Sequence, residues 1–223
     1  MSPTTLALLR IATGLMVAWT GDVHGAPAAA GLDPALRTVP WGLAWFADNL
    51  AISQEIAEVV RWSTVAAALA GLVGAASRSA FAIAAVGFAY LSAVGQLAGS
   101  VTHNHHLLWL CVLLAASPCG DALAVDSWRR GTAGRASLAY AVPIWAARCL
   151  IACIYGFPGL WKLIHGGSAW LDGETLTNLM HWKWMQAGRV PWPRVDELDS
   201  LLSVAGALVI AFELGMPVWI VWR

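Results

Sequence analysis

The feature that most constrains this chain is a series of long apolar segments separated by polar loops. A helix needs about 20 mostly apolar residues to cross the hydrocarbon core of a bilayer, and lipid admits only helices or closed barrels. The fourth of these segments, His103–Pro118, is short for a full crossing. We predict an all-α fold, a polytopic membrane helical bundle of about six spans, forming a single domain over residues 1–223. The six apolar segments are Thr4–Thr20, Ile56–Ala76, Ala80–Gly99, His103–Pro118, Ala139–Ile164 and Leu201–Trp222.

Composition supports a membrane protein and argues against several other classes. The chain is 59% hydrophobic and 12% charged, whereas soluble domains carry roughly a quarter charged residues. Its formal net charge is zero, so we expect the lipid bilayer as a partner and no nucleic acid. We expect no cleavable signal peptide, because the first apolar segment runs long and lacks a small-x-small cleavage site.

The segments between the spans are expected to be loops with short interfacial helices. We interpret Gly21–Ser53 as a polar loop that ends in an aromatic interfacial helix, and residues 175–188 as a second interfacial helix. Small residues at four-residue spacing in the second and third spans predict close helix packing. They are Ala67, Gly71, Ala75, Gly87, Gly95 and Gly99. The four cysteines are expected to be small buried apolar residues, namely Cys111, Cys119, Cys149 and Cys153.

An even number of spans places both termini on one side of the membrane. The loops that carry Arg78, Arg129, Arg130 and Arg135 fall on that side, and the positive-inside rule makes it cytoplasmic. Three basic residues on the opposite side weaken this signal. We therefore expect a multi-pass protein of the cell membrane with cytoplasmic termini, and a candidate site toward the outer face.

Lys162 is the most informative single residue, because it lies near the end of an apolar segment. One interpretation is a lysine that snorkels to the membrane surface. The other is a functional lysine whose ammonium is desolvated by Trp161, which favours a neutral amine that acts as a base or nucleophile. We expect Gly166 and Gly167 to break the helix and Trp170 to fold back over the site.

Three further charges lie within apolar segments. Arg10 is explained by snorkelling to the cytoplasmic surface. Arg148 lies deep in the fifth span and Glu213 deep in the sixth. An unpaired guanidinium in hydrocarbon is costly. Since both residues lie at similar distances from the cytoplasmic side, we predict that they form an ion pair.

A histidine cluster, Thr102-His103-Asn104-His105-His106, opens the fourth span. Thr102 or Asn104 is suited to cap the helix that follows. The three imidazoles also suit a metal or acid/base chemistry. We expect no metal, because no carboxylate lies beside them in sequence and residues i and i+2 of a helix point apart.

These motifs together resemble the membrane domain of vitamin K-dependent γ-carboxylases and the broader set of horizontally transferred transmembrane (HTTM) proteins. The resemblance lies in Asn104-His105, the acidic turn Asp121–Asp126, the helix with Arg148, Tyr155, Gly159 and Lys162-Leu163, the motif Trp170-x-x-Gly173, and Glu213. It covers most of the chain. We expect this chain to be short at the C-terminus relative to the family and to lack its extramembrane substrate domain.

The resemblance implies an activity and a set of site residues. Lys162 is the counterpart of a catalytic base toward reduced vitamin K or another isoprenoid quinol, and His105 is the counterpart of a catalytic histidine. The implied chemistry is quinol-dependent oxygenation to the epoxide, or carboxylation of a peptide glutamate. The expected substrate or quinone pocket comprises Asn104, His106, Arg148, Tyr155, Trp161, Trp170 and Glu213.

Two other classes of function stay open at this stage. One is a non-catalytic membrane module that binds a lipid, a partner protein or a second copy of the chain. The other is a small quinone-interacting redox subunit. A transporter is disfavoured, because the sequence shows no paired broken helices in two halves.

Overall fold

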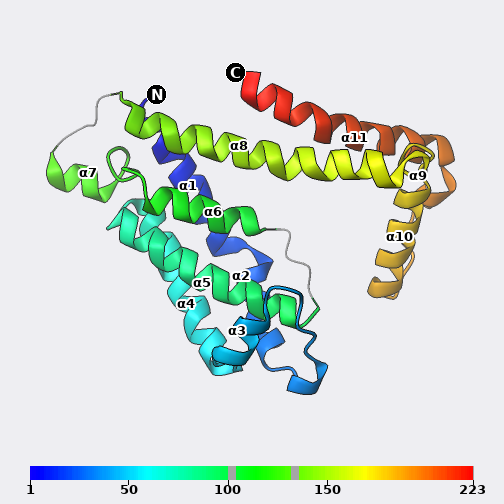
Figure 1. The fold of residues 1–223 in the computed structure, drawn as a ribbon, viewed down its shortest axis with the longest axis horizontal. Helices are drawn as coiled ribbons and strands as arrows, with labels where there is room; N and C mark the ends of the chain where they lie inside the picture. The colour runs from blue at the N-terminus through cyan, green and yellow to red at the C-terminus, as the bar shows by residue number, and fades with distance from the viewer. Residues whose placement is uncertain (100–103, 132–135, 223) are drawn as a thin grey trace. The chain divides into compact units, whose positions relative to one another are not determined.

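The computed structural model describes residues 1–99, 104–131 and 136–222, and within these ranges the regular elements are all helices. This confirms the predicted all-α membrane bundle (Figure 1). The chain forms two compact units, Met1–Ala147 and Arg148–Arg223. The helix α8 contributes to both, and the single domain over residues 1–223 stays a prediction.

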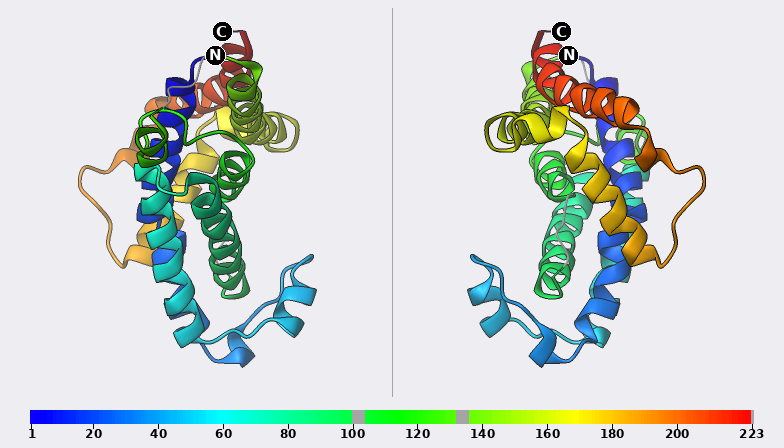
Figure 2. Two further views of the ribbon diagram at one scale, coloured as in Figure 1. Left: turned by 90° about the vertical axis from the view of Figure 1, so that its left-hand side faces the viewer. Right: turned by 90° about the vertical axis from the view of Figure 1, so that its right-hand side faces the viewer.

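The packed core of the first unit consists of the long helices α1, α4 and α5 and the shorter helices α2 and α6. The helix α4 lies against α1 and α5, and α5 also packs against α2 and α6. These helices appear side by side in the blue, cyan and green parts of Figures 1 and 2. The bounds are α1 Pro3–Trp19, α2 Gly21–Ala30, η1 Pro34–Leu36, α3 Ala44–Asn49, α4 Gln54–Val73, α5 Ser77–Leu97, α6 His105–Ala115 and α7 Val125–Arg130.

The second unit contains the rest of α8 and the segments that follow it. A π-helical turn continues α8, and the chain then folds back through short helices into α11. The bounds are α8 Leu138–Trp161, η2 Lys162–Gly166, α9 Ser168–Leu171, α10 Glu174–Ala187, η3 Val195–Glu197 and α11 Asp199–Trp222.

Five helical segments in the described residues are long and apolar enough to cross a membrane, which makes this a multi-pass membrane protein. The fourth predicted span, α6, has 11 residues and rises only about 16 Å. The chain nevertheless returns along it, because Arg78 at the start of α5 donates to the carbonyl of Ser117 just after α6, at 3.0 Å. The five long segments are Pro3–Ala30, Gln54–Val73, Ser77–Leu97, Leu138–Gly166 and Asp199–Trp222.

The prediction of a polar loop from Gly21 is wrong, since the first span continues through a second helix. Thr20 has an extended backbone, with φ −65° and ψ 140°, and α2 begins directly after it. The buried residues of α2 are small or β-branched and pack against α4 and α5. The predicted aromatic helix is present as α3, in the segment between α2 and α4 (Figure 2).

Close helix packing at small residues is confirmed at two positions. A Cβ at Gly71 would lie 2.8 Å from the Phe81 ring, and one at Gly87 would lie 2.0 Å from the Thr64 hydroxyl oxygen. At Gly95 and Gly99 the prediction is wrong, because nothing lies within 4 Å of a Cβ there. The expected burial holds for two cysteines and fails for the two on α8: Cys111 and Cys119 are buried, while Cys149 and Cys153 are exposed.

Arg10 does not snorkel to the surface. Its side chain is fully buried, and the guanidinium donates hydrogen bonds to the carbonyls of Cys119, Ala122 and Leu123 at 2.9, 3.1 and 2.5 Å. The loop after α6 therefore surrounds the two terminal nitrogens of the guanidinium with carbonyl oxygens, while the buried Nε has no hydrogen-bond partner among the described residues. This contact ties the first helix of the chain to the loop that precedes α7.

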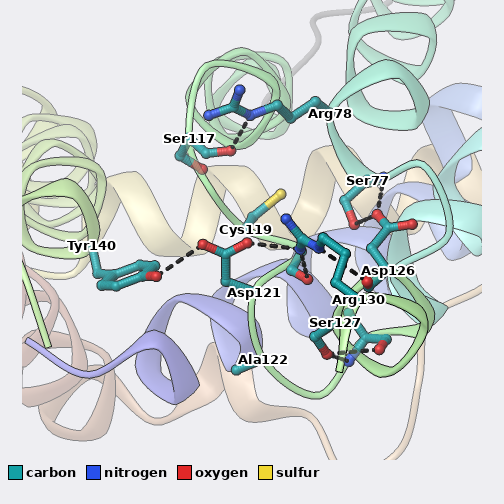
Figure 3. Close-up of polar contacts among 12 residues, drawn as sticks. Ser77, Arg78, Ser117, Cys119, Asp121, Ala122, Asp126, Ser127, Arg130 and Tyr140 are labelled. Atoms are coloured by element: carbon teal, nitrogen blue, oxygen red, sulfur yellow. Dashed lines mark hydrogen bonds and ion pairs between the residues drawn. The ribbon is translucent and has the colours of Figure 1, made fainter. Parts of the chain in front are cut away.

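The acidic turn Asp121–Asp126 is held in the same region (Figure 3). Asp121 accepts from Arg130 and Tyr140, each at 2.8 Å. Asp126 accepts from the amides of Ala76 and Ser77 and from the Ser77 hydroxyl, all at 2.9 Å. Partial burial raises the pKa of Asp126, but these hydrogen bonds outweigh it and hold the pKa below its ordinary value. Asp126 is therefore anionic at neutral pH.

Candidate functional site

Lys162 lies where α8 changes into a π-helical turn. The turn runs from Lys162 to Gly166, and Gly167 follows with φ of +47°, which favours glycine. The predicted helix break is thus confirmed at the expected pair of glycines. Such single π-turns are frequent at functional sites, because they rotate the side chains that follow.

The Lys162 ammonium forms an ion pair with Glu213 of α11. The distance from Nζ to Oε1 is 2.5 Å, and the two side chains are 21% and 15% exposed. Both residues lie within helical segments that are long and apolar enough to span the membrane. A charge in such a segment is costly unless it is paired, so the pair explains how both groups are tolerated there.

Trp170 covers the lysine after the chain folds back. Its ring centroid lies 4.4 Å from Nζ of Lys162, within cation–π distance. Trp161, expected to desolvate the lysine, is instead 65% exposed and stacks on His165 with ring centroids 3.7 Å apart. The tryptophan that shields the ammonium is therefore the one on the returning segment.

The predicted ion pair between Arg148 and Glu213 is wrong. Glu213 packs beside Gly159, where an added Cβ would lie 2.8 Å from the Glu213 Cβ. Arg148 lies 11 residues earlier on α8, about 16 Å along the helix axis, which exceeds the reach of its side chain. Glu213 therefore pairs with the lysine, and Arg148 is half-buried at the start of the second unit.

Close packing holds α8 and α9 against α11. A Cβ at Gly206 would lie 1.9 Å from the Trp170 carbonyl oxygen, and one at Gly173 would lie 2.8 Å from the Leu202 Cβ. The rings of Tyr155 and Phe212 meet edge-on, 5.5 Å apart. These contacts hold Trp170 and Glu213 close to the lysine. Figure 1 shows α8 and α11 running side by side.

An apolar hollow of about 500 Å³ opens beside Lys162. Its lining is apolar, and the lysine contributes its aliphatic stem. A flat lipophilic ring fits a hollow of this kind, since small-molecule sites are mostly apolar with a few polar groups at one end. The lining residues are Phe157, Pro158, Leu160, Trp161, Lys162 and Ile164.

The histidine cluster lies in the first unit. Asn104 lies at the N-cap position of α6, as predicted, but its side chain makes no capping hydrogen bond. Its amide instead donates to Asp22 at 2.8 Å and to Thr20 at 3.3 Å. His105 is exposed and His106 is half-buried, while Thr102 and His103 lie outside the described residues.

The sequence interpretation missed Asp22, which accepts a hydrogen bond from Asn104 at the break between α1 and α2. The missed signal is an acidic residue inside an apolar stretch that continues to Ala30. Asn104 and His105 belong to the first unit, and Lys162 belongs to the second. That His105 and Lys162 line one cavity therefore stays a prediction.

A third polar cluster joins α10 to η3. The carboxylate of Asp196 accepts from Arg194 at 2.6 and 2.8 Å and lies 3.0 Å from Nε2 of His181. These hydrogen bonds, that of Arg194 above all, hold the pKa of Asp196 well below its ordinary value. The cluster fixes the end of the segment that returns to α11.

Comparison of this chain with protein-family models, with curated proteins and with solved structures finds no match.

Proposed function

We propose that this chain binds a lipophilic quinol beside Lys162 and that the Lys162–Glu213 pair handles the quinol proton. The single observation that carries the proposal is an ion pair inside membrane-spanning helices, at the edge of an apolar hollow. Intramembrane ionisable groups mark substrate and proton pathways more often than structural contacts. The resemblance to HTTM proteins and γ-carboxylases belongs to the same proposal.

The residues present fit an isoprenoid quinol. The hollow offers an apolar surface for the ring and tail, and its lining includes Lys162, which pairs with Glu213. When bound, the reduced quinone supplies electrons for reaction with oxygen. Trp170 lies over the ammonium and limits the access of water from its side. Exclusion of water strengthens the electrostatic interactions within such a site.

The pair can present a neutral base without changing its net charge. If the proton moves from Lys162 Nζ to Glu213, a neutral amine lies beside a neutral carboxylic acid. The amine then accepts a proton from a phenolic hydroxyl, and the resulting ammonium is attracted to the phenolate. Glu213 thus holds the proton that Lys162 must lose before it acts as a base.

Turnover of vitamin K hydroquinone in lipid nanodiscs tests this proposal, with the epoxide measured by chromatography. Because a positioned general base contributes about 10²- to 10⁴-fold, Lys162→Ala is expected to lower the rate by at least about 100-fold. Lys162→Arg keeps the charge but cannot act as a base, so it is expected to be equally inactive. Lys183→Ala, at the chain's only other lysine, serves as the matched control.

Two outcomes would contradict the proposal. Epoxide formation that Lys162→Arg leaves intact would show that only the positive charge matters. If the wild type shows no turnover and Lys162→Ala binds quinone as tightly as the wild type, both the proposed activity and the proposed binding site are excluded.

A second candidate is a non-catalytic membrane module in which the pair only joins α8 to α11. The close contacts of Gly156 with Pro217 and of Gly159 with Glu213 favour it, because they pack α8 tightly against α11 where the pair lies. In that case Lys162→Met with Glu213→Leu preserves stability and phenotype, whereas either single change destabilises the protein. A catalytic pair loses activity in the double variant as well.

We also propose that both termini are cytoplasmic, in the cell membrane. The contact of Arg78 with Ser117 supports a return of the chain across the membrane along α6. In the second unit α11 runs antiparallel to α8, since Gly156 contacts Pro217 and Gly159 contacts Glu213. The basic residues Arg78, Arg129 and Arg130 then lie on the cytoplasmic side.

A further inference from the structure

A hollow of about 630 Å³ opens in the first unit where α4 ends and α5 begins. We call it the arginine hollow, since three arginines line it from α5 and α7. Figure 3 shows Arg78 and Arg130 around the loop after α6. The full lining is Ala76, Ser77, Arg78, Ser79, Pro118, Gly120, Asp121, Asp126, Arg129 and Arg130.

The carboxylates of the hollow are engaged by the protein itself. Asp121 is held by Arg130 and Tyr140, and Asp126 by the start of α5. Among the residues that the structure describes, neither Arg78 nor Arg129 forms an ion pair. Within that part of the chain, Arg78 and Arg129 are therefore without a direct carboxylate partner, and the three arginines and two aspartates of the lining leave it a net positive charge.

Two of the arginines are held in place by the backbone. Arg78 donates through Nε to the Ser117 carbonyl at 3.0 Å, which leaves its terminal nitrogens to other acceptors. Arg130 donates to the Gly120 carbonyl at 2.9 Å and to the Asp126 carbonyl at 3.1 Å. A guanidinium that is already oriented loses less conformational entropy when it binds a phosphate, whose oxygens match its planar donors.

The position of the hollow favours a lipid over a soluble anion. It lies at the junction of two membrane-spanning helices, which end at Val73 and start at Ser77. Trp128 of α7, next to Arg129, is 82% exposed. An exposed tryptophan beside arginines is typical of a segment at the headgroup level of a bilayer.

From these observations we propose that the arginine hollow binds the phosphate of an anionic phospholipid headgroup, with Arg78 and Arg129 as the main charge partners. This site is separate from Lys162 and does not depend on quinol binding. Each basic residue near an anionic membrane surface contributes about fivefold in affinity. Phosphatidylglycerol is therefore expected to bind more tightly than phosphatidylcholine of the same chain length.

Native mass spectrometry of the full chain in detergent micelles tests the proposal. The probes are phosphatidylglycerol and phosphatidylcholine, and the readout is the ratio of the two bound lipids. We expect Arg129→Gln to lower the ratio about fivefold, and Arg78→Gln to lower it further. The matched control is Arg189→Gln, at an exposed arginine of the second unit, which is expected to leave the ratio unchanged.

Each contrary outcome overturns the proposal. Equal binding of the two lipids removes the preference for an anionic headgroup. An unchanged ratio in Arg129→Gln, a variant that loses no hydrogen bond or ion pair within the described chain, places the lipid elsewhere. If free glycerol phosphate at the concentration of the lipid displaces phosphatidylglycerol, the hollow is a site for a soluble anion.

Discussion

Buried charges in this protein are neutralised in two ways. Arg10 is surrounded by backbone carbonyls of one loop, whereas Lys162 faces the carboxylate of Glu213. Carbonyl dipoles stabilise a charge that never changes. A carboxylate can also exchange a proton with its partner. The two environments therefore suit a structural arginine and a chemically active lysine, respectively.

Arg10→Met tests the structural role at the residue scale. The substitution keeps a long apolar side chain but leaves the carbonyls of Cys119, Ala122 and Leu123 without their donor. Unsatisfied buried acceptors are costly, so we expect a loss of about 3 kcal/mol in stability. Thermal unfolding in detergent micelles measures it, and Arg189→Met is the exposed control. Equal melting temperatures of the two variants would contradict the role of Arg10.

The Asp196 cluster predicts a pH dependence of stability. The pKa of this carboxyl is depressed in the folded protein, so its stabilising effect is present above the unfolded pKa of about 4. The effect is lost as the pH falls through the depressed folded value. The wild type is expected to exceed Asp196→Asn in melting temperature at pH 5 to 7, and the margin is expected to shrink below about pH 4.

Melting curves of both proteins from pH 3 to pH 7 measure this margin. A margin that grows as the pH falls below about 4 would contradict the assignment. His181→Ala is a useful companion, because it removes one donor to Asp196 and leaves Arg194 in place.

The individual site residues were easier to predict from the sequence than their partners. Lys162 and Glu213 stand out because charges are rare in apolar segments, and Trp170 follows a glycine pair that must break a helix. The predicted partner of Glu213 was wrong because the depth of each residue in the membrane was counted from the end of its predicted span. The true offset between α8 and α11 is set by glycine contacts at Gly156 and Gly159, which the spacing of charges does not encode.

At the scale of elements, α9 is the smallest piece of structure with a large consequence. Its four residues place Trp170 over Lys162, and the Trp170 carbonyl packs on Gly206 of α11.

Helix positions with strong apolar patterns were predicted well, including α4, α5, α8 and α11. The helix α2 was missed because its small residues and Pro27 resemble a loop in composition, and only packing against α4 and α5 makes it a helix.

A pair of glycine substitutions on α11 tests the role of α9. A methyl group at Gly206 meets the Trp170 carbonyl oxygen, whereas Gly215 on the same helix has nothing within 4 Å of a Cβ. Overpacking of a tight contact costs about 1–3 kcal/mol, so Gly206→Ala is expected to lower the melting temperature and weaken quinone binding. Gly215→Ala is expected to do neither. Equal effects of the two would show that α9 is not held at Gly206.

At the scale of the whole molecule, the parity of the crossings decides which sides of the membrane the termini face. The sequence predicted six crossings from hydropathy, but α6 is too short to be recognised as a span by length alone. The contact between Arg78 and Ser117 supplies the missing information, because it brings the chain back to the end of the first unit from which α5 started. A hydropathy pattern carries no information about a contact of this kind between distant residues.

Reporter fusions at each end of the chain test this topology. A fluorescent protein that folds only in the cytoplasm is expected to be active at both the N-terminus and the C-terminus. An exported phosphatase is expected to be inactive at both. Opposite results at the two ends would mean that the chain crosses an odd number of times, and a reporter placed after Ser117 would then show whether α6 fails to cross.

The carbonyl cage of Arg10 also sets an order for biosynthesis. A ribosome must add more than a hundred residues after Arg10 before Cys119, Ala122 and Leu123 exist. Until then the nascent first helix carries a guanidinium without its final acceptors, at a cost of about 3 kcal/mol in a bilayer. The insertion machinery or lipid headgroups must accommodate that charge in the interval. Final docking of α1 is therefore a late event, even though this helix leaves the ribosome before the loop that binds it.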